Sequence, residues 1–427
     1  MVRNIVILGG NSHPKLVDSI CGTLGIPACQ RILGRFEVGE SRCEIKDSVR
    51  GKDVFIIQTA GPGQVNDHFM DLCIMISACK TGSARRVTAV LPLFPYSRQP
   101  DVPYNKSGAP LSKPTAEPAK KDYTFESVPA TPAPGIAKSA GLASGVDLSR
   151  MLSKTSISNG NTDSPQTNGT NGVTRNHADS VESSSGGFTT HDYENMSVIS
   201  SFQAKPGYKR WVAQAGTLIA DLLTCAGADH IITMDLHDPQ YQGFFDVPVD
   251  NLYGKPLLQR YIQQHIPDYR DHIIVSPDAG GAKRATAIAD SLSMEFALIH
   301  KERRPTKITE RQNATMMLVG NVKGRVCILI DDLADTANTI TRAAKLLKKE
   351  GATKIYALIT HGVLSGDAIP RINASAIDKL IVTNSVPQDE HQAQCPKLEV
   401  LNISAVFSEA IRRVHHGESI SVLFSYD

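Results

Sequence analysis

An acidic pair followed by hydroxyl side chains is the stretch of this sequence best equipped for chemistry. Its polar members, which follow the apolar run 326–330, are Asp331, Asp332, Asp335, Thr336 and Thr339. The apolar run predicts a buried strand, and the apolar spacing from residue 340 predicts an amphipathic helix. Backbone N–H groups at a helix start and threonine hydroxyls can hold a phosphate, while carboxylates can bind sugar hydroxyls or Mg²⁺. The pattern favours a site for a phosphorylated ligand; the competing interpretation is a solvated loop with a helix cap.

A histidine surrounded by carboxylates follows another predicted strand. Asp235 and His237 come after the run 231–234, and Asp246 and Asp250 follow closely. A histidine with carboxylates can bind Mg²⁺ or Mn²⁺, although an isolated histidine is more often a hydrogen-bonded structural residue.

A glycine turn and a basic pair complete the set. Asp278 follows the strand predicted at 273–276, and the glycines 280–281 allow close approach of a ligand to the backbone. Lys301 and Arg303 place two cations just past the strand predicted at 296–299. Taken alone, the glycine turn could also be no more than a tight strand-to-helix connection. The basic pair could likewise be no more than a solvated edge of a sheet.

Alternating strand and helix patterns must position these clusters. Such repeated units predict parallel sheets covered by helices on both faces, with ligands beyond the carboxyl ends of the strands. The helices are expected at 68–78, 211–225 and 408–414. Strands are expected at 4–8, 53–58, 86–91 and 230–234. Strands and helices then alternate over 273–276, 287–292, 296–299, 325–330, 354–359, 379–382 and 397–403, with a helix following the glycine turn 280–281.

Composition bounds the class of protein. The 427 residues suffice for two domains, and the net charge of +2 gives no signal for nucleic-acid binding. Eight scattered cysteines without metal-finger spacing favour free thiols in a reducing cytoplasm. No apolar run reaches membrane-spanning length, and the first residues do not form a signal peptide pattern. Residues 101–206 are dominated by Ser, Thr, Asn, Gly and Pro, which predicts a disordered insertion.

Several motifs resemble one enzyme family. The loop 331–339 resembles the binding loop for 5-phosphoribosyl 1-diphosphate (PRPP) that type I phosphoribosyltransferases and PRPP synthetases share. The string 234–253 resembles a PRPP synthetase signature that phosphoribosyltransferases lack. Segments 36–40, 91–99, 275–284 and 296–303 also resemble motifs of PRPP synthetases, and all the motifs occur in the order found in that family. The chain is therefore similar to ribose-phosphate diphosphokinases (PRPP synthetases), and resembles an insertion-bearing fungal subunit.

This resemblance implies a fold and a reaction. Two type I phosphoribosyltransferase-like α/β domains are expected, each a mostly parallel sheet flanked by helices. Residues 1–100 and 207–256 would form an ATP-side domain, with 409–427 packing back on it, and 257–408 a ribose-5-phosphate domain. The diphosphoryl group of MgATP would pass to the 1-hydroxyl of ribose 5-phosphate, giving PRPP and AMP. Partner subunits, in a hexamer-like homo- or hetero-oligomer, are expected; nucleic acid and membranes are not.

The resemblance also implies residue roles. Lys301 and Arg303 are expected to be catalytic. The residues expected to contact ATP are Phe36, Glu40, Arg98, Gln99 and His237, the first two from a neighbouring subunit. The residues expected to contact ribose 5-phosphate are Asp278, Asp331, Asp332, Asp335, Thr336, Asn338 and Thr339. The metal region comprises Asp235, His237, Asp246, Asp250 and Asp278, and a regulatory site would use Ser48, Arg50, Gln242, Asn251, Ser419 and Phe424.

Three positions depart from the family pattern. Gly108 replaces an arginine of a mobile loop, Val38 an adenine-side asparagine, and Asn338 a glycine, although asparagine tolerates positive φ. Losing a cation from a closing loop weakens transition-state stabilisation. A working synthetase subunit and a weakly active or inactive regulatory subunit therefore both stay open, whereas a phosphoribosyltransferase acting on a base fits the string 234–253 poorly.

Overall fold

Two parallel sheets form the framework of the protein. The computed structural model describes residues 4–61, 63–98, 111–112, 203–204, 215–302 and 315–424, without the side chains of 111–112, 203–204, 301–302 and 315. Both sheets belong to one compact unit, residues 1–105 and 211–427. The first is parallel throughout, in the order β1 (Ile5–Gly9), β4 (Asp53–Ile57), β5 (Arg86–Leu91), β8 (His230–Met234), β9 (Val249–Leu252).

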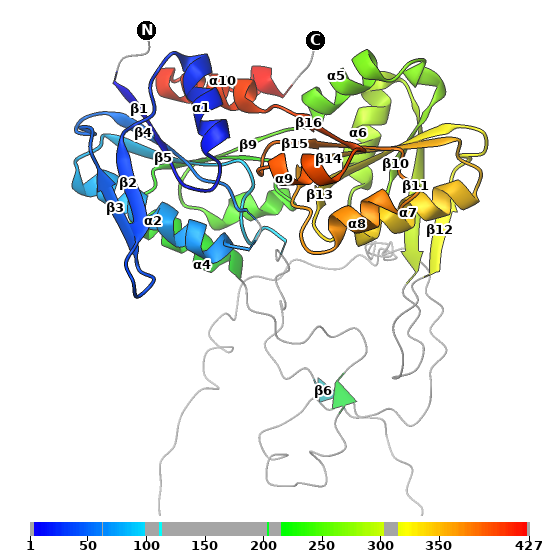
Figure 1. Cartoon of the computed structure of the whole chain (residues 1–427), viewed down its shortest axis with the longest axis horizontal. Coiled ribbons are helices and arrows are strands. Elements are labelled where there is room, and N and C mark those ends of the chain that lie inside the picture. Colours follow the sequence, from blue (N-terminus) through cyan, green and yellow to red (C-terminus); the bar gives the residue numbers. More distant parts are fainter. Residues whose placement is uncertain are drawn as a thin grey trace, which may run out of the picture. The chain divides into compact units, whose positions relative to one another are not determined.

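Helices cover both faces of this first sheet (Figure 1). On one face, α1 (Pro14–Leu24) and α10 (Ser404–His416) bury Leu16, Ile20, Phe407 and Ile411 against strand residues. On the other face lie α2 (Val65–Thr81) and α4 (Ala215–Ala226). A hairpin of β2 (Arg31–Arg35) and β3 (Ser41–Ile45) packs on α2. The last long helix of the chain thus completes the core of the first sheet.

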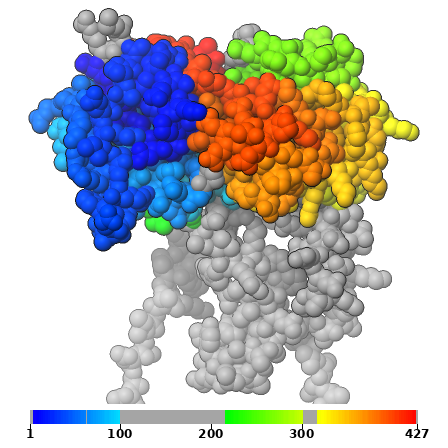
Figure 2. All heavy atoms as spheres, in the orientation of Figure 1, coloured from blue at the N-terminus to red at the C-terminus, as the bar shows by residue number. Residues whose placement is uncertain are grey.

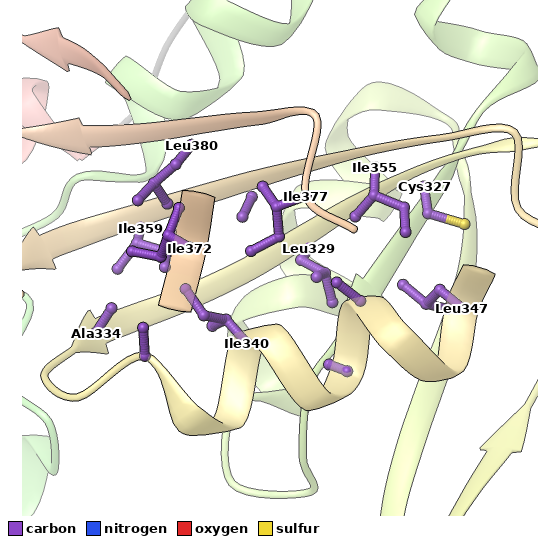
Figure 3. Packing of buried hydrophobic residues seen from close by; sticks show 14 of the residues in the cluster. Cys327, Leu329, Ala334, Ile340, Leu347, Ile355, Ile359, Ile372, Ile377 and Leu380 are labelled. Atoms are coloured by element: carbon purple, nitrogen blue, oxygen red, sulfur yellow. The ribbon is translucent and has the colours of Figure 1, made fainter. Parts of the chain in front are cut away.

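The second sheet has seven strands. In spatial order they are β12 (Thr315–Val319), β11 (Glu295–Glu302), β10 (Ile273–Ser276), β13 (Val326–Ala334), β14 (Lys354–Gly362), β15 (Lys379–Thr383) and β16 (Leu398–Leu401). Of these, only β11 and β12 pair antiparallel. Figure 3 shows Ile340 and Leu347 of α7 (Asn338–Lys349) packed beside Leu329 and Ile355, where helix and strands share one core cluster. One face carries α5 (Lys255–His265) and α6 (Ala282–Leu292); the other carries α7 (Asn338–Lys349) and α8 (Ala368–Asn373).

The two sheets meet through polar contacts near their strand ends. Lys15 of α1 pairs with Asp389 of α9 (Asp389–Gln394) at 2.6 Å. In the space-filling view the N-terminal residues, blue, lie directly against the C-terminal residues, orange to red (Figure 2). His13 and Thr59 contribute further links, to the carbonyl oxygens of Asn384 and Ser385 at 2.9 and 2.6 Å.

Most predicted elements occur. The helix expected after the glycine turn 280–281 is α6, in which Ala285, Ile288, Ala289 and Leu292 bury one helical face. The strand predicted to stop at residue 330 runs to Ala334, because β14 continues to pair with it through Gly362. The hairpin β2–β3 and the strand β12 were not predicted.

The predicted disordered insertion lies almost entirely outside the described residues. Within the unit formed by residues 106–210, the structure describes β6 (Leu111–Ser112) and β7 (Gln203–Ala204), which pair antiparallel. Among the described helices, none has the length and apolarity needed to cross a bilayer. The domain boundaries given in the sequence analysis stay predictions.

Candidate active site

The acidic loop is built by a strand that runs on past its acids. Asp331 pairs in register with Ile359 of β14, and β13 ends only at Ala334. A short turn follows, in which Ala337 has φ +57°, and α7 begins at Asn338. Asn338, which stands where the family pattern has glycine, begins the helix, and Ala337 before it adopts the left-handed conformation. The Asn338 amide donates to Thr336 Oγ1 at 3.1 Å.

This loop lines a cavity of about 380 Å³. The end of β10, the start of α6 and residues of the first sheet form the remaining walls. The lining residues are Arg98, His237, Asp278, Gly280, Gly281, Arg284, Asp331, Asp332, Leu333, Ala334, Asp335, Thr336, Ala337, Asn338, Thr339 and Ile340. All seven residues predicted for ribose 5-phosphate lie here, together with two of those predicted for ATP.

Asp332 is the centre of a buried charge cluster. One carboxylate oxygen lies 2.6 Å from His237 Nδ1 and the other 2.9 Å from Arg284 Nη1. Burial alone would raise the pKa of Asp332, but the His237 hydrogen bond and the Arg284 charge outweigh it and lower that pKa. The same hydrogen bond, opposed by burial, raises the pKa of His237. The cluster therefore favours an ionised Asp332 and a protonated His237.

Asp331 has the opposite electrostatics. Burial first, and then the neighbouring charges of Asp332 and Asp278, raise its pKa well above the ordinary value. Asp278 accepts a hydrogen bond from the Gly281 N–H at 3.1 Å. A Cβ on Gly281 would lie 3.8 Å from an oxygen of Asp331 and 3.9 Å from one of Asp278, so the glycine keeps the space beside both carboxylates open. Two hard oxygen donors that repel each other are a suitable setting for a divalent cation.

Arg98 links the first sheet to the acidic loop. It lies in the turn that follows β5, and its Nη1 is 2.8 Å from Asp335 Oδ2. Ser365 donates a hydrogen bond to the other oxygen of Asp335. Burial would raise the pKa of Asp335, but these bonds together outweigh it and lower that pKa. The loop thus presents Asp335 as a carboxylate engaged from both sides.

The predicted metal region is not gathered at one place. Asp235 Oδ2 accepts hydrogen bonds from the Gly254 N–H at 3.0 Å and Thr360 Oγ1 at 2.5 Å. Asp250 pairs with His230 at 2.8 Å, and Asp246 is exposed in the bend before β9. In the described part of the chain, no three His, Cys, Asp or Glu side chains are arranged to hold a metal ion. Asp235 and Asp250 are close in the sequence but have different partners: Asp235 contacts Thr360 of the second sheet, whereas Asp250 contacts His230 of the first.

Other predicted residues lie away from the cavity or outside the described residues. Gln99 and Arg303 are not described, and Lys301 is described only as backbone of β11. Phe36 and Glu40 form the exposed tip of the β2–β3 hairpin, where the Phe36 N–H donates to the Glu40 carbonyl at 2.8 Å. They are not among the residues that line the cavity of their own chain.

The six predicted regulatory residues occupy separate elements. Ser48 and Arg50 are exposed between β3 and β4, and Gln242 lies in the 3₁₀ helix η2 (Pro239–Phe244). Asn251 is 5 % exposed, and its Oδ1 accepts from the Leu236 N–H at 3.2 Å. Ser419 and Phe424 flank the 3₁₀ helix η4 (Ser421–Leu423) near the C-terminus. Within this chain, Asn251 serves the packing of β9 rather than a surface.

Sequence reasoning missed Arg284 and Ser365 as members of the site. Arg284 stands in the first turn of α6, three residues after Gly281, so the glycine turn that carries Asp278 was the signal for it. Ser365 lies in the loop after β14, and nothing local marks it as a partner of Asp335.

Comparison with known proteins places the chain in a family. Residues 5–113 match the N-terminal domain of ribose phosphate pyrophosphokinase, and residues 303–425 match the phosphoribosyl synthetase-associated domain. The chain is 47% identical over 426 residues to ribose-phosphate pyrophosphokinase 5 of Schizosaccharomyces pombe, covering 100% of this chain and 99% of that one. A crystal structure of phosphoribosylpyrophosphate synthetase from Mycobacterium smegmatis aligns with a TM-score of 0.67 and 30% identity, over 97% of this chain and 100% of that one.

The predicted family, fold class and enzyme class are thereby confirmed. The similarity covers nearly the whole of this chain, so it includes the residues of both parallel sheets. The chain belongs to the ribose-phosphate pyrophosphokinase (PRPP synthetase) family.

Proposed function

We propose that this chain transfers the diphosphoryl group of MgATP to the 1-hydroxyl of ribose 5-phosphate, giving PRPP and AMP. The observation that supports this reaction is the cavity itself. It joins an acidic, hydroxyl-bearing helix start from the second sheet to Arg98 and His237 from the first. One part suits a phosphorylated sugar and the other suits a nucleotide triphosphate, so the two substrates would meet at the boundary of the two sheets.

Ribose 5-phosphate binds at the loop side of the cavity. Its phosphate lies at the N-terminus of α7, where Thr336, Thr339 and the backbone N–H groups of the first helical turn supply donors. Asp331 and Asp278 face the sugar hydroxyls. Asp332 does not contact the sugar in this arrangement, because His237 and Arg284 already bind its two carboxylate oxygens.

ATP binds from the first sheet. Arg98, Gln99 and His237 contact the nucleotide, and Phe36 and Glu40 reach the adenine from a neighbouring subunit. The 1-hydroxyl oxygen of the sugar forms a bond to the β-phosphorus while the bond from that phosphorus to the oxygen of the α-phosphate breaks. AMP leaves with the bridging oxygen, and the hydroxyl proton is released. Lys301 and Arg303 stabilise the charge that develops, and positioning supplies much of the rate.

Magnesium fits the carboxylates on the sugar side of the cavity. Asp278 and Asp331 would hold it, with substrate oxygens and water as further ligands, in keeping with the preference of Mg²⁺ for one or two carboxylates plus phosphates. Bound Mg²⁺ neutralises phosphate charge. Asp246 and Asp250 do not fit this role, since one is exposed elsewhere and the other pairs with His230.

A second candidate function is a weakly active or inactive subunit that regulates other synthetase subunits. Val38, at the hairpin tip, is 80% exposed and carries no polar group for an adenine. Gly108, in the loop after Arg98, lies outside the described residues. In this proposal the chain works in the cytoplasm within a homo- or hetero-oligomer, with residues 1–100 and 207–256 on the ATP side and 257–408 on the sugar side.

A direct assay separates the two candidates. The purified full chain is incubated with MgATP and ribose 5-phosphate, alone and co-expressed with related subunits, while AMP and PRPP are measured by ³¹P NMR. We expect slow or no PRPP formation alone and a gain with a partner. Full activity of the isolated chain would exclude the regulatory candidate. Loss of the partner-dependent gain in Asp331→Asn, but not in the exposed Glu350→Gln, is expected if this cavity is the site.

A further inference from the structure

We propose that Asp235 is a positioning residue that locks the end of β8 to β14 and thereby sets His237 against Asp332, instead of binding a metal. The inference deepens the proposed function and rests on it where the reaction is concerned. Asp235 directly follows β8 and adopts φ +41°, an uncommon conformation for a residue with a side chain. Such a backbone persists where surrounding contacts hold it in place.

Two donors from different elements hold the carboxylate. Asp235 is 6% exposed, and its Oδ2 accepts from the Gly254 N–H at 3.0 Å and from Thr360 Oγ1 at 2.5 Å. A Cβ on Gly254 would lie 2.8 Å from that oxygen, so a glycine permits the approach. Thr360 is fully buried in β14, and its carbonyl accepts from Thr383 Oγ1 at 2.6 Å. One oxygen of the carboxylate therefore already has two donors inside the protein.

A second link stands beside the first. His361 Nε2 lies 2.9 Å from the Met234 carbonyl, and its Nδ1 lies 2.8 Å from Ser385 Oγ. The residue before Asp235 and the Asp235 side chain are thus both fixed to consecutive residues of β14. On the far side, the Leu236 N–H donates to Asn251 Oδ1 at 3.2 Å. The backbone has little freedom across these three residues.

The register of the second sheet connects the contacts of Asp235 to the position of Asp332. Thr360 lies between Ile359, the strand partner of Asp331, and His361, the strand partner of Leu333. Asp332 therefore sits on the strand pair that also carries the anchor for Asp235. His237, two residues beyond the lock, reaches Asp332 at 2.6 Å. A shift of β8 against β14 changes the distance between His237 and Asp332 directly.

The test compares both ends of the lock. The variants are Asp235→Asn, Thr360→Val and their combination, with Thr353→Val, an exposed threonine just before β14, as the matched control. Each single lock variant should lower the kcat of the partner-supported full chain by about 10- to 100-fold with KM values within about twofold, because misplacement affects the transition state. The double variant should be no worse than either single one, because the two residues act as one unit.

Two further measurements do not depend on activity. In hydrogen–deuterium exchange, a peptide covering 231–241 should exchange faster in Thr360→Val and Asp235→Asn than in the wild type. Its exchange rate in Thr353→Val should equal that of the wild type. Binding of Mn²⁺ alone, followed by electron paramagnetic resonance, should match the wild type in both. Mn²⁺ affinity lost in Asp235→Asn but kept in Thr360→Val would overturn the inference, as would unchanged exchange in Thr360→Val. An inactive wild-type chain with the expected exchange would count against the proposed function and leave the lock standing.

Discussion

Arg98 and Asp335 form an ion pair of 2.8 Å that joins a residue proposed to contact ATP to one proposed to contact ribose 5-phosphate. The Arg98 side chain is 53% exposed and that of Asp335 is 25% exposed, so solvent screens the pair. The pair is therefore expected to matter for ligands more than for folding.

Replacing Arg98 by alanine should separate these two effects. We expect the free energy of unfolding to change by less than about 1 kcal/mol, the usual value of an exposed ion pair. The affinity for an ATP analogue should fall, because a cation facing the triphosphate is lost. Urea unfolding and isothermal titration calorimetry measure the two quantities. Lys15→Ala, which removes the exposed pair with Asp389, is the matched control and should leave nucleotide affinity unchanged.

The adjacent acids Asp331 and Asp332 should respond oppositely to neutralisation. Asp332→Asn removes the charge that holds His237 and Arg284, and should destabilise the fold by on the order of 3 kcal/mol, as for other broken buried charge pairs. Asp331→Asn removes a charge that its neighbours disfavour, and should leave stability unchanged or improved while ribose-5-phosphate affinity falls. Urea denaturation of both variants provides the measurement. Equal destabilisation would contradict the electrostatic assignment.

Stability should fall on acidification through a cluster far from the cavity. Asp53, 1% exposed, accepts hydrogen bonds from Arg85, Arg86 and His415. Burial would raise the pKa of Asp53, but the Arg85 hydrogen bond and the Arg86 charge, with the other contacts, outweigh it and lower that pKa.

The sign of the effect follows from the unfolded chain, where an aspartate has a pKa of about 3.9. Above that value the lowered pKa of Asp53 contributes its full stabilisation, and the contribution is lost as pH falls toward the folded-state pKa. Melting temperatures recorded from pH 6 to 3 should therefore decline more steeply in the wild type than in Asp53→Asn. The exposed Asp18→Asn reports the effect of losing a surface carboxylate, and parallel curves for wild type and Asp53→Asn would contradict the expectation.

Two glycine-to-alanine variants should differ in sign. A Cβ on Gly254 would lie 2.8 Å from both Asp235 Oδ2 and Thr360 Oγ1, so Gly254→Ala should destabilise by about 1–3 kcal/mol, as over-packing does. Gly22 lies inside α1, where nothing comes within 4 Å of the added atom. Gly22→Ala should stabilise by about 0.5–1 kcal/mol through helix entropy. Thermal unfolding measures both, and a stable Gly254→Ala would show that the contact around Asp235 can relax.

Short sequence patterns predicted the parts of the candidate site that lie directly after a buried strand. The run 326–330 followed by Asp331 and Asp332 was recognisable, because a buried parallel strand is apolar and its carboxyl end collects polar residues. The gathering of Asp278 with Asp331 was expected because both follow parallel strands, whose carboxyl ends carry the ligands in this architecture. Nothing local could show that Asp235 faces Thr360, since these residues are 125 positions apart in the sequence and their contact depends on how the two sheets meet. The continuation of β13 to Ala334 has the same origin, because it depends on pairing with β14 that no local pattern shows.

The position of α10 has a consequence for synthesis of the chain. This helix supplies Phe407, Ile411 and Val414 to the core shared with Leu16 and Ile20, close to the other end of the polypeptide. A growing chain that still lacks residues 404–416 exposes that apolar face throughout translation of everything between. The first sheet can therefore reach its final packing only after residues 404–416 have been synthesised and have left the ribosome. Products terminated before these residues would expose this apolar face to chaperones or proteases.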